Sequence, residues 1–120
     1  MEEDLIRGLY ETALRKMKDR YGLAAEPRLL CVSDTDAFNA ALRELGKEPD
    51  DLAECAVAEV VKSPTGYVIL VRMDKTTTAD QTLYILLHEL GHVLCMEREK
   101  ISTDEWEPTD FAHIPVVKRS

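Results

Sequence analysis

Apolar side chains recur every three or four positions along three stretches of the chain, a spacing typical of amphipathic helices. The first stretch covers residues 3–21 and ends at Gly22, a residue common just after the last turn of a helix. The second opens at the capping-type residues 33–36 and ends near Gly46, and the third covers residues 79–98. The apolar positions of these faces are Ile6, Tyr10, Ala13 and Met17, then Phe38, Ala41, Leu42 and Leu45, then Leu83, Leu86, Leu87, Leu90 and Leu94.

Short apolar runs between turn-forming residues predict three β-strands. The first is expected at residues 28–32, and the others at about 53–62 and 67–73. The sequence Ser-Pro-Thr-Gly between the last two runs favours a β-hairpin. The order helix, strand, helix, hairpin, helix predicts an α+β fold, in which a short mixed sheet with this hairpin packs on the last helix. Residues 102–120 are expected to fold back against the domain as a short C-terminal closure. No linker divides residues 1–120, so a single domain is expected.

The chain is acidic, with a formal net charge of −8 over 120 residues. This charge argues against direct binding of nucleic acids or anionic membranes, because phosphate contacts require clustered lysine and arginine. No apolar run is long enough for a membrane span, and the acidic start is unlike a signal peptide. Cys31, Cys55 and Cys95 are odd in number and widely spaced, which does not indicate a disulfide framework. We therefore expect a cytoplasmic protein.

The last predicted helix carries the sequence HELGH at residues 88–92, an H-E-x-x-H motif. Residues i and i+4 lie one turn apart on the same helical face, so His88 and His92 can bind one metal ion. Glu89 lies beside this pair, where it can take a proton from metal-bound water without being a ligand. A T-x-x-Q capping box at Thr78 begins the helix where the motif needs one. A Zn²⁺ site is favoured over a core helix with two chance histidines, because burying imidazoles without partners is costly.

A third protein ligand has to come from elsewhere, because catalytic zinc commonly has three protein ligands and an open position for water. Glu97 and Glu99 follow the motif too closely to turn back towards the metal. A thiolate ligand at Cys95 is conceivable, but a small apolar residue packed beneath the site is the simpler interpretation. His113 can be a ligand or a surface histidine, and Asp110 can be a ligand or an acceptor that orients an imidazole. The candidates in the tail are Asp104, Glu105, Glu107, Asp110 and His113.

The order of these features resembles the ImmA/IrrE-like zinc metallopeptidases: a hairpin, a short polar link, HELGH on a helix, and an acidic residue shortly before Phe-Ala. The resemblance covers about residues 53–115. In that family the tail reads roughly E-x-E-A-N-x-F-A, and its first glutamate is the third zinc ligand, which implies Glu105 here. Pro108 stands where the family has alanine, and a proline disturbs a helix there, so Glu107 is the next candidate. The matching positions are Glu105, Glu107, Phe111 and Ala112.

Residues and resemblance together predict a zinc-dependent metallopeptidase with a zincin-like domain. His88, His92 and Glu105 are expected to hold Zn²⁺, while Glu89 activates the water that attacks a peptide carbonyl. An exposed edge strand is expected to bind the extended peptide by adding a strand. The resemblance further implies limited, regulatory cleavage of a partner protein such as a repressor. Two alternatives stay open: a non-catalytic, metal-stabilised protein-binding module, which does not need Glu89, and a small zinc hydrolase with a non-peptide substrate.

Overall fold

Three strands form one mixed sheet in the computed structural model, which describes residues 1–49 and 56–98. The strand order is β1-β3-β2. Strand β1 (Arg28–Val32) pairs in parallel with β3 (Gly66–Arg72), and β2 (Ala58–Ser63) pairs antiparallel with β3. Among the described residues, β3 is therefore the central strand, while β1 and β2 are the two edges.

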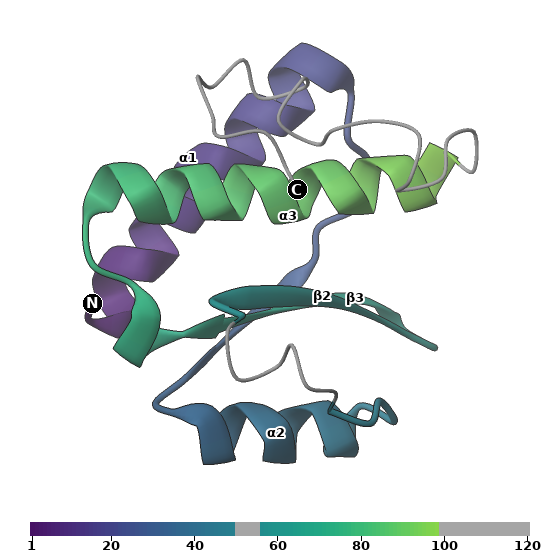
Figure 1. Ribbon diagram of the computed structural model, residues 1–120. Coiled ribbons are helices and arrows are strands. Elements are labelled where there is room, and N and C mark those ends of the chain that lie inside the picture. The colour runs from purple at the N-terminus through teal and green to yellow at the C-terminus, as the bar shows by residue number, and fades with distance from the viewer. Residues whose placement is uncertain (50–55, 99–120) are drawn as a thin grey trace.

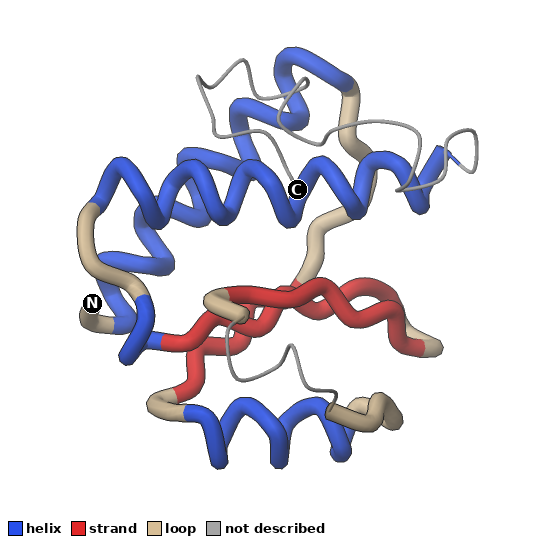
Figure 2. The backbone as a smooth tube through the Cα atoms, viewed as in Figure 1, coloured by secondary structure: helices blue, strands red, loops and turns tan. Residues whose placement is uncertain are grey.

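Helices cover both faces of this sheet (Figure 1). Helices α1 (Glu3–Tyr21) and α3 (Ala79–Arg98) lie on one face, and α2 (Thr35–Glu44) lies on the other. A short 3₁₀ turn, η2 (Met73–Lys75), joins β3 to α3. The tube in Figure 2 shows the same layers, with the sheet in red between blue helices. The described part of the chain is thus an α+β domain of three α-helices and a three-stranded mixed sheet.

The core is divided by the central strand, because neighbouring residues of a strand point to opposite faces. Ile69 and Val71 of β3 are buried against α1 and α3, whereas Leu70 is buried in a second cluster with Phe38 and Leu42 of α2. With both faces covered, β3 reads as a continuous apolar run rather than as an alternating one. No helix within the described ranges is both long and apolar enough to cross a membrane.

Most predicted boundaries are confirmed. Helix α1 ends at Gly22, which adopts the left-handed conformation with φ 68°, and β1 covers the predicted residues 28–32. Helix α2 begins at the N-cap Asp34, whose carboxylate accepts the Ala37 N–H at 2.9 Å. It ends just before Gly46, where φ is 84°. These boundaries follow from local capping chemistry, which a sequence displays directly.

Both strands of the hairpin differ from their predicted bounds. Strand β2 begins at Ala58, and residues 56 and 57 lie outside it, while the predicted start at residues 53–55 falls outside the described residues. Strand β3 covers residues 66–72 rather than 67–73, because Met73 already belongs to η2. Apolar residues continue past the start of β2 and past the end of β3, whereas strand pairing stops where β3 turns into η2. The predicted C-terminal closure at residues 102–120 also lies outside the described residues.

The turn from β3 into α3 is held by a buried arginine. Arg72 is only 2% exposed, and its guanidinium donates to the two carboxylate oxygens of Asp74 at 3.1 and 2.8 Å. It also donates to the hydroxyl of Thr35 at the start of α2 and lies 6.0 Å from the ring centre of Phe38. The hydrogen bond from Arg72 lowers the pKa of the Asp74 carboxyl. This network joins β3, η2 and α2 at the point where the chain enters α3.

The other end of α3 is held by a carboxylate. Glu97 accepts the backbone N–H groups of Ala24 at 3.0 Å and of Ala25 at 2.6 Å, both in the connection between α1 and β1. The neighbouring Arg98 donates to the carbonyl of Tyr21. Charge-assisted hydrogen bonds of this kind are stronger than neutral ones. Together they fix the C-terminal turn of α3 against the end of α1.

We expect Glu97→Ala to lower the free energy of unfolding by about 1–2 kcal/mol, because two backbone N–H groups lose a charged acceptor. The matched control is Glu11→Ala on the exposed face of α1, which should change it by less than about 0.5 kcal/mol. Urea unfolding followed by circular dichroism measures both. Equal stability of the two variants would show that the Glu97 contacts contribute nothing.

Candidate metal centre

Helix α3 begins with the predicted cap, although only half of the capping box forms. The hydroxyl of Thr78 accepts the Gln81 N–H at 3.2 Å. The side chain of Gln81, however, accepts a hydrogen bond from the hydroxyl of Thr77 instead of returning to the backbone of Thr78. The accepted bond is sufficient to satisfy one of the N–H groups that a helix start leaves without an intrahelical partner.

The buried face of α3 determines where the motif points. Its leucines pack against α1 and the sheet, as the periodicity predicts, although Leu83 is only partly buried. Glu89 and His92 line a hollow between α3 and β2. His88 lines a neighbouring hollow between the same two elements. The motif side chains therefore face β2, along the border of the apolar face. The fully buried leucines are Leu86, Leu87, Leu90 and Leu94.

The two motif histidines face each other through the same ring atom. The Nε2 atoms of His88 and His92 are 3.2 Å apart. Their ring centres lie 4.8 Å apart, and the ring planes are nearly perpendicular, at 82°. Two nitrogen ligands at about 2.0–2.1 Å from one tetrahedral zinc ion lie about 3.3 Å apart, so the observed pair has the spacing that such an ion requires. The same spacing also permits a hydrogen bond between two neutral imidazoles.

Glu89 lies where two hollows meet. One, of about 320 Å³, is lined by His92 and Met96 of α3 and by residues 58–60 of β2. The other, of about 200 Å³, is lined by His88, Tyr84 and Ile85 and by residues 57 and 58. Glu89 and Ala58 line both, so the two hollows adjoin between α3 and β2, with Glu89 between them, and we call them together the groove.

Tyr84 belongs to this site, although sequence reasoning did not select it. Its ring centre lies 6.1 Å from that of His88, at an angle of 55° between the planes. The available signal was position, because Tyr84 precedes His88 by four residues and so lies one turn away on the same face. Tyr84 forms part of the wall of the smaller hollow, next to His88.

The described residues offer no third ligand beside His88 and His92. Within residues 1–49 and 56–98, no group of three or more histidine, cysteine or acidic side chains is arranged to hold a metal. Cys95 is buried and does not complete such a group, and Glu97 binds the backbone of residues 24 and 25. The predicted candidates lie outside the described residues, so these predictions stay open: Asp104, Glu105, Glu107, Asp110 and His113.

Thiol chemistry is disfavoured at Cys31, a free cysteine outside this site. Burial raises the pKa of the Cys31 thiol. The positive charge of Arg7 acts to lower this pKa but offsets only part of the effect of burial. A protonated thiol is a poor nucleophile, because the thiolate is the reactive form. Cys31 is one of the partly buried residues packed against the core.

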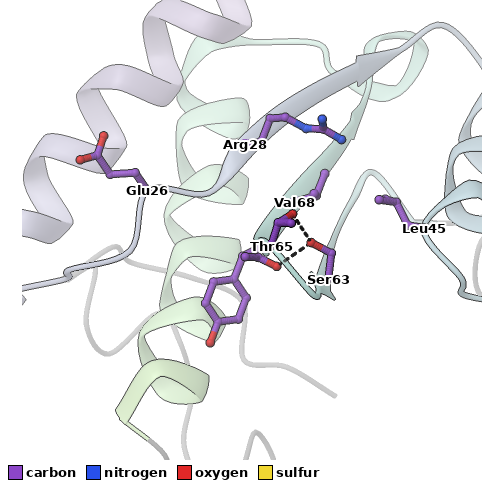
Figure 3. Close-up of a pocket in the computed structure, with 8 residues that line it drawn as sticks. Glu26, Arg28, Leu45, Ser63, Thr65 and Val68 are labelled. Carbon is purple, nitrogen blue, oxygen red and sulfur yellow. Dashed lines mark hydrogen bonds between the residues drawn. The ribbon is translucent and has the colours of Figure 1, made fainter.

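A third hollow lies at the hairpin turn (Figure 3). It measures about 330 Å³ and is bordered by Arg28 of β1, Leu45 after α2 and the turn residues. The hydroxyl of Ser63 donates to the Gly66 carbonyl at 3.0 Å within that turn. Within the described ranges, this hollow shares no lining residue with the groove beside Glu89, and it is not bordered by His88, Glu89 or His92. Volume alone therefore does not distinguish the candidate site.

No family model, curated protein or solved structure matches this chain. The resemblance to the ImmA/IrrE-like metallopeptidases therefore depends on the motif at residues 88–92, the order of elements and the tail. It stays a prediction.

Proposed function

We propose that this protein is a zinc-dependent metallopeptidase. The observation that carries the proposal is the 3.2 Å separation of the His88 and His92 Nε2 atoms, which matches two ligands of one zinc ion. When bound, zinc polarises a carbonyl group and makes a coordinated water acidic enough to react near neutral pH. Imidazole nitrogen suits zinc better than it suits the harder cations magnesium and calcium.

Glu89 is the proposed general base. It follows His88 directly in α3 and lines both hollows of the groove, so this residue lies next to the histidine pair at the groove. A carboxylate there can accept the proton of the attacking water and then donate it to the leaving amine. A purely structural metal site does not need such a group, which disfavours the binding-module alternative.

A peptide substrate is supported by the main chain of β2. The Arg72 N–H donates to the Val57 carbonyl at 2.9 Å, which continues by one residue the antiparallel register in which Ala58 lies opposite Val71. In such a ladder, alternate residues direct their N–H and C=O groups to the partner strand. Ala58 and Val60 therefore direct theirs away from β3, at the outer edge that borders the groove. An extended peptide can pair with these groups beside Glu89.

The partner class follows from the family resemblance. Limited cleavage of a partner protein, such as a repressor, is the proposed role, with DNA recognition left to that partner. The acidic chain, with a net charge of −8, is consistent with this division of tasks. The zincin-like packing of α3 on the sheet edge is part of the same proposal.

We expect the full-length protein to bind about one zinc ion per chain, with a third ligand from the tail. Glu105→Ala should lower zinc affinity by at least about ten-fold, and more than the same change at Glu107, Asp110 or His113. Isothermal titration with zinc at neutral pH measures all four variants beside the unmodified chain. Loss of zinc only in His113→Ala would instead identify a three-histidine site, and no zinc binding by the unmodified chain would overturn the proposal.

A further inference from the structure

The two halves of the groove differ in what lines them beyond the motif. The larger hollow, beside His92, has an apolar wall made by Met96 and by Ala58 and Val60 of β2. All three side chains are partly buried, so each presents some apolar surface to the hollow. We call this hollow the Met96 pocket. Its wall has no role in holding the metal or in moving the proton.

Glu59 also borders the Met96 pocket, but its charge is directed elsewhere. Ala58 and Val60 pack on the α1 and α3 side of the sheet, so the intervening Glu59 points to the α2 side. There its carboxylate forms an ion pair with Lys47, which follows α2. Among residues 1–49 and 56–98, the lining of the Met96 pocket is therefore made of apolar side chains and β2 main chain, apart from Glu89 and His92.

The direction of a bound peptide follows from the course of α3 and β2. Tyr84 and Ile85 lie with Val57 at one end of the groove, and Met96 lies with Val60 further along both elements. The helix and the strand therefore run in the same direction. Antiparallel pairing is slightly more stable than parallel pairing. A peptide antiparallel to β2 places its amino-terminal part beside Val60 and Met96.

We infer that the Met96 pocket selects substrates with a large apolar side chain on the amino-terminal side of the cleaved bond. This inference depends on the proposed peptidase function and adds a specificity to it. The volume of about 320 Å³ accommodates a leucine, methionine or phenylalanine side chain. Met96 is unbranched and adaptable, so the pocket accepts this class of side chain rather than one residue type. An apolar side chain should be preferred over a charged one by about ten- to hundred-fold.

The experiment has two stages and uses the full-length, zinc-loaded chain. First, a mixed peptide library is digested and the cleaved bonds are identified by mass spectrometry. A cleaved sequence is then synthesised with a fluorescent label and with leucine, glycine or aspartate on the amino-terminal side of the bond. Binding of these peptides to zinc-loaded Glu89→Gln protein is measured by fluorescence anisotropy. This stage does not depend on catalysis.

We expect the leucine peptide to bind at least about ten-fold more tightly than the aspartate peptide. Adding Met96→Lys to the Glu89→Gln protein should remove or reverse this preference, because a cation then lines the pocket. Leu5→Lys is the matched control, since Leu5 is 59% exposed on α1 and should leave the preference unchanged.

Three results would overturn the inference, and they are distinguishable from one another. Cleavage without an apolar preference on the amino-terminal side contradicts the pocket while leaving the peptidase function standing. A preference that Met96→Lys does not alter assigns the selectivity to other residues. A zinc-loaded chain that cleaves no peptide contradicts the proposed function itself, and the inference fails with it.

Discussion

Replacing Glu89 with glutamine is expected to leave zinc binding and folding intact and to slow peptide hydrolysis by about a hundred- to ten-thousand-fold. Glutamine keeps the size and hydrogen-bonding reach of glutamate but cannot accept the proton of the attacking water. Glu89 lines both halves of the groove rather than the core, so the substitution removes no core packing. The loss should therefore appear in the chemical step, as a fall in kcat with little change in KM.

The matched control for this variant is Glu11→Gln, which removes an equivalent charge from the exposed face of α1. It should cleave at the rate of the unmodified chain. The first substrate to assay is a repressor-like protein encoded beside this gene, with cleavage products identified by mass spectrometry. If Glu89→Gln cleaved as fast as the control, Glu89 would not be the general base. Zinc and partner binding without cleavage, in both proteins, would favour the binding-module alternative.

His88→Ala and His92→Ala should each abolish stoichiometric zinc binding, because each removes one of the two imidazole nitrogens, 3.2 Å apart, that we propose bind the ion. Bound zinc stabilises the folded state by mass action, by about 4 kcal/mol when its free concentration is a thousand times the dissociation constant. Both variants should lose that stabilisation and melt at a lower temperature than the zinc-loaded parent protein. Elemental analysis and thermal unfolding measure the two effects.

A chelator provides the control for these two variants. Without metal, the parent protein and the variants should differ in stability by less than about 1 kcal/mol, because the imidazoles lie at the groove rather than in the leucine core. A large difference that persists in the chelator would mean that the histidines stabilise the fold by themselves. Zinc binding that survives in both variants would contradict the site.

The elements of this fold could be predicted because their signals are local. Periodic apolar residues, the carboxylate of Asp34, the hydroxyl of Thr78 and the glycines after α1 and α2 act within a few residues of the structure they define. The ends of β2 and β3 were less predictable. Their limits depend on which residues find a partner across the sheet, whereas apolar composition continues beyond them.

The candidate site was likewise predictable only where its residues are close in sequence. Spacing along one helix was sufficient to bring His88 and His92 together, and this is confirmed by the position of their Nε2 atoms. Tyr84 escaped selection because a tyrosine one turn before the motif is equally typical of a packing residue. Met96 could not be predicted as a site residue, because its neighbour in the groove, Val60, is 36 residues away along the chain.

By itself, the sequence determined the α+β class, the helix that carries the motif, and the pair of imidazoles on one face, because helical geometry relates residues only four positions apart. Only the tertiary structure decided that β2 is the strand beside Glu89. That position follows from the parallel pairing of β1 with β3, which leaves β2 at the edge of the described sheet. It also decided that Glu97 binds the backbone of Ala24 and Ala25, 73 and 72 residues away. Contacts across such distances depend on how elements pack, and no local pattern records them.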